Sequence, residues 1–282
     1  MWLSDAWQDY ELMDAGDGMK LERWGDVILS RPEPQAVWRP QHPALWEKAD
    51  AVYHRSNAGG GNWSYARTLP ESWQIGYGAL RFYVRPTGFK HTGLFPEQGV
   101  NWDWAAQKIR QAGRPVRVLN LFSYTGGATL ACAAAGAEVV HVDAAKGIVS
   151  WAKENAALSG LAEAPIRYLV DDALQFVRRE ARRGRKYEGI IMDPPSYGRG
   201  PDGQMFRFET HIQPLVEAAA ALLSEEPLFF ILNSYTAGFA PDVGGNVLKT
   251  ALPKGQIEAD NIGLVMPGGM ALPCGATARW TP

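Results

Sequence analysis

The chain has 282 residues, a formal net charge of −2 and a hydrophobic fraction of 46%. This length allows one large domain or two smaller ones, and the hydrophobic fraction is sufficient for a globular core. No apolar run is long enough to cross a bilayer and the N-terminus lacks a signal pattern, so we expect a cytoplasmic protein without a membrane partner. The weakly acidic balance gives no cue for a nucleic-acid-binding domain, although a local basic patch suffices for RNA.

Two cysteines and five histidines show no pattern typical of a disulfide framework or a metal site. Cys132 and Cys274 lie far apart in the sequence without CxxC spacing, and the histidines lack metal-ligand spacing. We therefore expect no bound metal. Cys132, within an alanine-rich helix pattern, is expected to be a small core residue.

The first 90 residues differ in texture from the rest. Nine of the eleven tryptophans precede residue 105, and short β-like runs at Asp26–Leu29, Trp73–Tyr77 and Leu80–Val84 are separated by glycine and proline. We expect a small β-rich domain over 1–90 and a joining segment over 91–115 that contains a helix at Asn101–Gln111. The tryptophans either fill a small core, which is commoner, or form a base-stacking platform.

From residue 116 to 282 apolar strand patterns alternate with helix patterns. The predicted strands are 116–122, 138–142, 166–170, 187–192 and 228–233, and the predicted helices are 127–135, 145–159, 172–183 and 208–223. This alternation predicts an α/β domain with a doubly wound, mostly parallel sheet. Gln256–Val265 and Met270–Trp280, joined by a Met-Pro-Gly-Gly turn, predict a closing antiparallel hairpin.

The segment Val116–Asp143 is half of a mononucleotide-binding unit: strand, glycine turn, helix, strand, acid. Gly126 and Gly127 let the backbone turn sharply and approach a ligand. Asp143, roughly 20 residues further on, stands where such folds bind ribose hydroxyls. A plain turn and a helix cap are the structural alternative. Nicotinamide- and flavin-binding sites usually contain the pattern Gly-x-Gly-x-x-Gly, which binds a pyrophosphate. The two adjacent glycines of this chain differ from that pattern and favour a ligand without pyrophosphate, such as S-adenosylmethionine (SAM).

Polar side chains follow each predicted parallel strand. Ligands of open α/β sheets bind beyond the carboxyl ends of the strands, so these tips are expected to share one crevice. Asp172 suits an acceptor for the adenine amino group, with Asp171 beside it, and helix N-capping is compatible with that role. The tip residues are Ser123, Tyr124, Thr125 and Gly126, then Asp143, then Asp171 and Asp172, then Asp193 to Tyr197, then Asn233, Ser234 and Tyr235.

The sequence Asp193-Pro194-Pro195-Ser196-Tyr197 is the most specific short signal in the chain. Two prolines fix the backbone after a buried strand and remove two donors. The Asp193 carboxylate and the Pro194 carbonyl are then acceptors that can orient the lone pair of an NH-bearing nucleophile, and Tyr197 can stack on a base. A rigid turn is the alternative reading. Methyl transfer needs mainly alignment, so we expect these positioning residues as the catalytic set rather than a triad.

One basic cluster stands apart from these tips. It precedes the fourth predicted strand, at the opposite end of the sheet, where a solvated helix end that complements the helix dipole is favoured over an RNA contact. Its members are Arg178, Arg179, Arg182, Arg183, Arg185 and Lys186.

The motifs FSYTGG, VDDAL and MDPPSY, with Val142-Asp143, resemble the bacterial large-subunit rRNA methyltransferases that modify cytosine C5 or guanine N7. These enzymes belong to the class I SAM-dependent superfamily, whose Rossmann-like sheet ends in an antiparallel hairpin. The segment Lys90–Gln98 (KHTGLFPEQ) is similar to the one that folds over the cofactor in that family. The resemblance covers about residues 80–235 and implies cofactor contacts from Thr92, Gly93, Gln98, Phe122, Ser123, Tyr124, Thr125, Gly126, Asp143, Asp172 and Asp193.

The chain also departs from that family. Gly99 stands where arginine is usual, Pro96 interrupts the start of the following helix, and no PUA-type RNA-binding domain is recognisable. The cytosine-C5 members carry a nucleophilic cysteine after the fifth strand, and Leu232–Thr236 has none, so this stretch is more similar to that of the guanine-N7 members.

These observations predict a SAM-dependent methyltransferase that acts on a base nitrogen of RNA, specifically rRNA. The alternative substrate for the same cofactor is a small molecule or a protein side chain. A SAM-binding module without catalysis, or a NAD-binding protein, is the remaining alternative. The intact Asp193-Pro194 signal speaks against the first of these and the adjacent glycines speak against the second.

Overall fold

The computed structural model describes residues 1–56, 60–200 and 203–282. The chain splits into two compact units, Met1–Gly99 with Gly263–Cys274, and Val100–Ile262 with Gly275–Pro282. This division differs from the predicted boundaries at 90 and 115, because the residues after 90 are hydrogen-bonded within the first unit. The Arg31 guanidinium donates to the Lys90 carbonyl at 2.8 Å, and the Ser4 hydroxyl donates to the Pro96 carbonyl at 2.7 Å.

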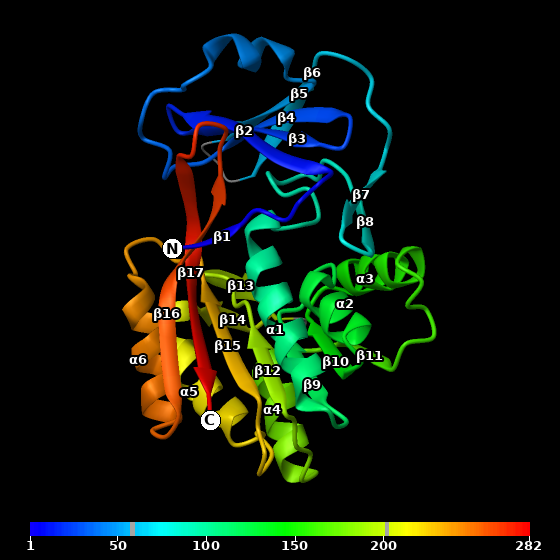
Figure 1. Cartoon of the computed structure of the whole chain (residues 1–282), viewed down its shortest axis with the longest axis vertical. Coiled ribbons are helices and arrows are strands. Elements are labelled where there is room, and N and C mark those ends of the chain that lie inside the picture. The colour runs from blue at the N-terminus through cyan, green and yellow to red at the C-terminus, as the bar shows by residue number, and fades with distance from the viewer. Residues whose placement is uncertain (57–59, 201–202) are drawn as a thin grey trace. The chain divides into compact units, whose positions relative to one another are not determined.

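The first unit is β-rich, as predicted (Figure 1). Its five-stranded sheet has the order β2-β3-β4-β5-β6, and β7 and β8 form a separate pair. The predicted runs 73–77 and 80–84 coincide with β7 and β8. The strands are β2 (Tyr10–Gly16), β3 (Met19–Trp24), β4 (Val27–Pro32), β5 (Ala51–Arg55), β6 (Gly61–Tyr65), β7 (Trp73–Tyr77) and β8 (Leu80–Val84), with two 3-10 turns, η1 (Pro43–Lys48) and η2 (Pro96–Gln98).

The tryptophans of the first unit fill its interior. Trp24 is fully buried, and across the described residues no tryptophan falls in the exposed class. The Trp73 indole donates to the Trp24 carbonyl at 2.8 Å, and the Trp63 indole donates to the Thr87 carbonyl at 2.8 Å. Trp24 is therefore a core residue and the other rings are half-buried, which does not fit an open stacking platform. The indole N–H groups of Trp24 and Trp38 are buried without a hydrogen-bond partner among the described residues.

The second unit contains the predicted doubly wound sheet. The whole sheet has the order β1-β16-β17-β15-β12-β9-β10-β11. Strands β15, β12, β9, β10 and β11 are parallel to their neighbours, and β17 is antiparallel to β15. The strands are β1 (Trp2–Ser4), β9 (Arg117–Leu121), β10 (Glu138–Asp143), β11 (Ile166–Val170), β12 (Gly189–Met192), β15 (Phe229–Ser234), β16 (Gln256–Val265) and β17 (Ala271–Thr281). Strand β1 belongs to the first unit, and β16 and β17 contribute residues to both units.

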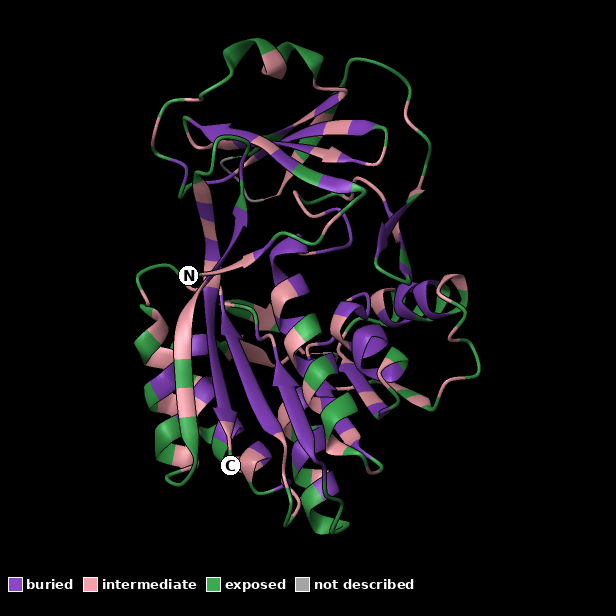
Figure 2. Cartoon of the chain, in the orientation of Figure 1, coloured by how far each residue is buried: buried purple, intermediate pink, exposed green. Residues whose placement is uncertain are grey.

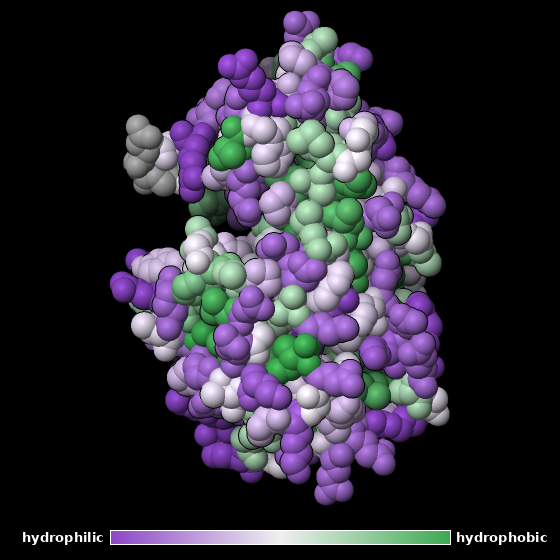
Figure 3. Space-filling view, turned by 60° about the vertical axis from the view of Figure 1, so that its left-hand side comes forward, coloured by the Kyte–Doolittle hydropathy of each residue, from purple (hydrophilic) through white to green (hydrophobic). Residues whose placement is uncertain are grey.

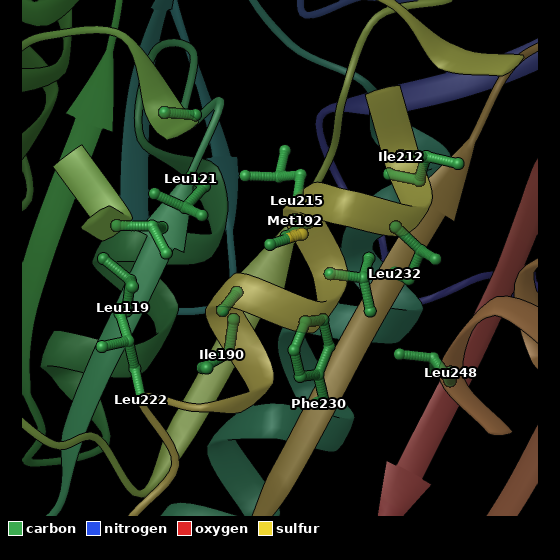
Figure 4. Packing of buried hydrophobic residues seen from close by; sticks show 14 of the residues in the cluster. Leu119, Leu121, Ile190, Met192, Ile212, Leu215, Leu222, Phe230, Leu232 and Leu248 are labelled. Carbon is green, nitrogen blue, oxygen red and sulfur yellow. The ribbon is translucent and has the colours of Figure 1, made fainter. Parts of the chain in front are cut away.

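Helices cover both faces of this sheet. On one face, apolar residues of β9, β12 and β15 pack on α4, α5 and α6; Figure 4 shows Leu121, Met192 and Leu232 pointing toward Leu215. On the other face α1 and α2 pack through Ala105 and Cys132. The central strands are accordingly buried (Figure 2). The helices are α1 (Gly99–Ala112), α2 (Gly127–Ala134), α3 (Lys146–Leu158), α4 (Ala173–Arg182), α5 (Phe208–Ala220) and α6 (Pro241–Ala251).

Three elements of the second unit were not predicted. Helix α6 contains the pair Gly244-Gly245, which are poor helix formers, and packing overrides that propensity. Its Pro241 occupies the first turn, where proline is tolerated. Strands β13 (Tyr197–Arg199) and β14 (Met205–Arg207) have three residues each, too few for a periodic pattern.

Hydrophilic side chains make up most of the face that Figure 3 shows, with hydrophobic ones in small groups between them. Among the described residues, no helix has the length and apolar character that a membrane span requires. Nor do the described residues contain a group of three or more His, Cys, Asp or Glu side chains suited to a metal ion. The large hydrophobic side chains that are exposed are Met1, Val37, Tyr65, Phe89, Val170, Tyr197, Val265 and Met270.

Candidate functional site

The carboxyl ends of four adjacent strands are level with one another. Leu121 of β9 pairs with Val142 of β10 on one side and with Met192 of β12 on the other, and Met192 pairs with Leu232 of β15. Asp143 and Asp193 follow the two strands that flank β9. They therefore lie on either side of the turn that follows β9, rather than at opposite edges of the sheet.

That turn has an unusual backbone. Phe122 and Tyr124 have φ angles of 57° and 50°, and Gly126 has φ 94°. In the described chain only one other non-glycine residue, Asp17, has a positive φ. Left-handed backbone at bulky residues is strained, and such strain concentrates at ligand-binding sites. The turn at the end of β9 therefore has a strained backbone conformation.

Hydrogen bonds fasten this turn to β10. The Ser123 hydroxyl donates to the Asn120 carbonyl at 2.6 Å, and the Ser123 and Val142 backbones are joined at 3.1 Å. At the far side of the turn, the Asn155 amide donates to the Thr125 carbonyl at 2.9 Å. Ser123, Thr125 and Asn155 are all buried. Asn155 was missed by the sequence analysis, because an asparagine within a helix pattern carries no local signal.

Asp143 is held by backbone donors. Its carboxylate accepts from the Tyr124 N–H at 2.9 Å and from the Ala145 N–H at 3.0 Å. Burial raises the pKa of this carboxyl, and the backbone hydrogen bonds only partly oppose that rise. No cationic side chain contributes to the shift. Asp143 is thus a half-buried acceptor that has no counter-ion among the described residues.

The two acids after β11 have separate structural roles. Asp172 is the N-cap of α4, where its Oδ1 accepts from the Gln175 N–H at 2.9 Å. Asp171 forms an ion pair with Arg179. The Asp172 capping that the sequence suggested is present, and its second oxygen remains available. Asp171 is engaged by a guanidinium, so its predicted ligand role has less support from the geometry.

The Asp-Pro-Pro segment leads from β12 into a tied loop. Asp193 is half-buried, Pro194 is buried and Tyr197 is 58% exposed. The Thr236 hydroxyl, from the loop after β15, donates to the Ser196 hydroxyl at 2.9 Å. The loops after β12 and β15 are therefore fastened to each other close to the Asp193 carboxylate.

Gly127 of the predicted glycine turn and the predicted tip residue Asn233 both contribute to packing. A Cβ on Gly127 would overlap the ring of Trp102, so Gly127 permits contact with α1 and not with a ligand. Asn233 is buried, and its Oδ1 accepts from the Asn101 amide at 3.0 Å and from the Thr277 hydroxyl. The expectation that Asn233 faces a crevice is therefore wrong, because this amide is engaged by α1 and β17.

The segment Lys90–Gln98 belongs to the first unit and is described there alone. Thr92 is fully buried, and its hydroxyl has no hydrogen-bond partner among the described residues. Gly93 has φ 107°, and Gln98 ends the turn η2, in which Pro96 occupies the start. Buried hydroxyls without a partner are rare, and the predicted ligand role of Thr92 stays a prediction.

Gly99 has a packing reason in this chain. A Cβ at this position would lie 2.5 Å from the Ser4 hydroxyl and 2.9 Å from the Tyr77 hydroxyl. Any larger side chain would push these two residues away. The departure from arginine is therefore compatible with a tightly packed first unit.

Comparison with known proteins agrees with this geometry. A family profile described as S-adenosylmethionine-dependent methyltransferase matches residues 39–220. The crystal structure of a SAM-dependent methyltransferase from Agrobacterium tumefaciens is 37% identical, covers 100% of this chain and 93% of its own, and superimposes with a TM-score of 0.95.

Curated relatives match over part of their length. The ribosomal RNA large subunit methyltransferase K/L of Shewanella frigidimarina is 38% identical over 122 residues, 43% of this chain and 16% of that protein. The methyltransferase K of Neisseria meningitidis is 26% identical over 235 residues, 78% of this chain and 64% of that protein. The chain thus spans less than two thirds of the length of either relative.

Proposed function

Because the chain belongs to the S-adenosylmethionine-dependent methyltransferase family, we propose that it methylates a nitrogen of a base in RNA, specifically in large-subunit rRNA. One observation carries the proposal: Asp143 and Asp193 flank the strained turn after β9 at the level ends of three adjacent strands. The relatives named as rRNA methyltransferases support RNA as the substrate class.

The residues of the second unit fit the cofactor. The turn Phe122–Gly126 winds its backbone around the strand end, as a nucleoside site requires. Asp143, a carboxylate without a counter-ion, suits ribose hydroxyls, and the free oxygen of Asp172 suits an adenine amino group. When bound, SAM supplies an electrophilic methyl group.

The residues of this chain align the target base with the methyl group. The Asp193 carboxylate and the Pro194 carbonyl accept hydrogen bonds from an NH-bearing base, and this orients the nitrogen lone pair. Tyr197 stacks on the base once it has left its helix. Cys132 and Cys274 are both buried, and burial raises the pKa of the Cys132 thiol to about 12. Neither thiol is suited to the covalent attack that cytosine C5 requires, which favours a nitrogen acceptor.

Transfer of labelled methyl from SAM tests the proposal. The purified protein is offered large-subunit rRNA transcripts, a protein extract and a small-molecule extract, and the RNA product is digested to nucleosides. We expect label in a base methylated on nitrogen, and a rate that falls about 100-fold or more in Asp193→Ala because alignment is lost. Label in the protein or small-molecule fraction alone would move the function to the alternative substrates.

A further inference from the structure

The hairpin β13–β14 presents two different faces. Tyr197 pairs with Arg207 and Arg199 pairs with Met205, whereas Phe206 lies opposite Gly198. Side chains alternate along strands, so the first four share one face and Phe206 points to the other. The Tyr197 hydroxyl donates to the Met205 sulfur at 3.6 Å, in agreement with a shared face.

The Phe206 face is packed on residues of the proposed cofactor site. The ring centroids of Phe206 and Phe122 are 5.4 Å apart. The ring of His211, a residue of the following helix α5, lies 5.7 Å from the ring of Phe206. At the end of β13, a Cβ on Gly200 would lie 3.2 Å from Oδ2 of Asp172. The hairpin is therefore anchored beside the turn after β9 and the N-cap of α4.

The opposite face is cationic and aromatic. Tyr197 is 58% exposed, and Arg199 and Arg207 are both exposed. Within the described part of the chain neither arginine forms an ion pair. In the sequence, Asp202 is three residues from Arg199, and Glu209, in the first turn of α5, is two residues from Arg207. Guanidinium groups bind phosphate through paired hydrogen bonds, and an exposed tyrosine ring is a platform on which a base can stack.

We propose that this face, formed by Tyr197, Arg199, Met205 and Arg207, is the contact surface for a single-stranded segment of the RNA substrate. Arg199 and Arg207 bind phosphates on either side of the target, and Tyr197 stacks on a base. The assignment rests on the proposed function. A strand is favoured over a protein partner because the face offers two cations and one ring, with no exposed apolar centre such as protein interfaces contain. It is favoured over a duplex because the target base must be unstacked.

A charge-matched pair of double variants tests this surface. Arg199→Gln/Arg207→Gln is compared with Arg178→Gln/Arg182→Gln, which removes two exposed charges from α4 instead. The affinity for an unstructured RNA oligonucleotide is measured over a salt series, and the affinity for SAM by calorimetry. We expect the hairpin variant to lose about tenfold or more in RNA affinity. We also expect its salt slope to fall by about 1.4, at ~0.7 per phosphate contact of a single strand.

The other results separate the possible failures. The SAM affinity of the hairpin variant should match that of the wild type, which also reports that the fold is intact, and the α4 variant should keep the wild-type salt slope. An unchanged slope in the hairpin variant, or an equal loss in the α4 variant, overturns the surface assignment while methyl transfer to RNA still upholds the proposed function. Equal competition by polyglutamate would assign the face to acidic protein. Wild-type protein that neither binds nor methylates RNA overturns both.

Discussion

Two acidic side chains, Glu22 of the first unit and Asp143 of the second, are held in opposite ways. In the first unit Arg31 donates to both carboxylate oxygens of Glu22, at 2.6 and 2.8 Å, and Lys20 lies 3.6 Å from the same carboxylate. In the second unit Asp143 has only backbone donors. One carboxylate has its counter-ions within the fold, and the other has none.

The pKa shifts of these two acids show what the difference means. Burial alone would raise both. For Glu22 the charges of Arg31 and Lys20 outweigh burial and lower the pKa to about 2, whereas for Asp143 burial prevails and the pKa is raised. The lowered pKa of Glu22 thus reflects its charged partners within the fold, whereas the raised pKa of the half-buried Asp143 supports the ligand role proposed for it.

The largest expected effect is on the stability of the first unit. Glu22→Gln leaves Arg31 buried without its carboxylate partner and Lys20 with Glu33 alone, and we expect a loss of about 3–5 kcal/mol in the free energy of unfolding. The control is Glu11→Gln, which removes the exposed pair with Arg23 in the same sheet and should cost under about 1 kcal/mol. Urea unfolding followed by tryptophan fluorescence measures both.

The pH dependence gives a second readout of this pair. The pKa of Glu22 is lowered on folding, so its contribution to stability is present above its ordinary value of 4.5 and disappears as the pH falls toward about 2. Glu22→Gln should lack this acid limb. Equal stability losses in Glu22→Gln and Glu11→Gln would remove the distinction between buried and exposed pairs.

The next effect is on cofactor affinity in the second unit. Asp143→Asn keeps the shape but removes the charge, and we expect SAM affinity to fall roughly 10- to 100-fold, from about 1.5–3 kcal/mol per charged hydrogen bond. In the wild type the affinity should also decline on acidification, beginning above the ordinary aspartate value of 3.8, because the raised pKa means that protonation occurs earlier. Calorimetry across pH checks both points, with the exposed Glu154→Gln as control. An Asn variant that binds SAM as the wild type does would contradict the ligand role.

The smallest expected effect separates backbone strain from ligand binding. Gly126→Ala and Gly136→Ala both force an L residue into the left-handed region, at φ 94° and 98°, and each should cost about 1–2 kcal/mol. A Cβ on Gly126 meets Leu130 at 3.0 Å in the proposed cofactor turn, while the space around Gly136 is open. Only Gly126→Ala should lower SAM affinity in addition. The same affinity change in both variants would show that the turn acts through stability alone.

Much of the second unit could be predicted from local patterns. The strand at 166–170 coincides with β11, and the predicted strands at 138–142 and 228–233 differ from β10 and β15 by a residue at the ends. In the first unit only β4, β7 and β8 were predicted as separate strands, and the rest was predicted only as β-rich. Its strand β3, for example, carries Lys20 and Glu22 as buried charges, so its interior face does not show the apolar alternation on which strand prediction depends.

The sequence by itself determined the order of strands and helices in the larger unit, the turn after β9, and the acids that follow β10 and β12. These features depend on periodicity and on the backbone chemistry of neighbouring residues, which are local. Only the tertiary structure decided that Gly127 makes room for the Trp102 ring and that Asn233 accepts a hydrogen bond from Asn101. It also decided which face of the β13–β14 hairpin is exposed. Each of these outcomes depends on a partner distant in the chain, and packing chooses that partner after the local elements exist.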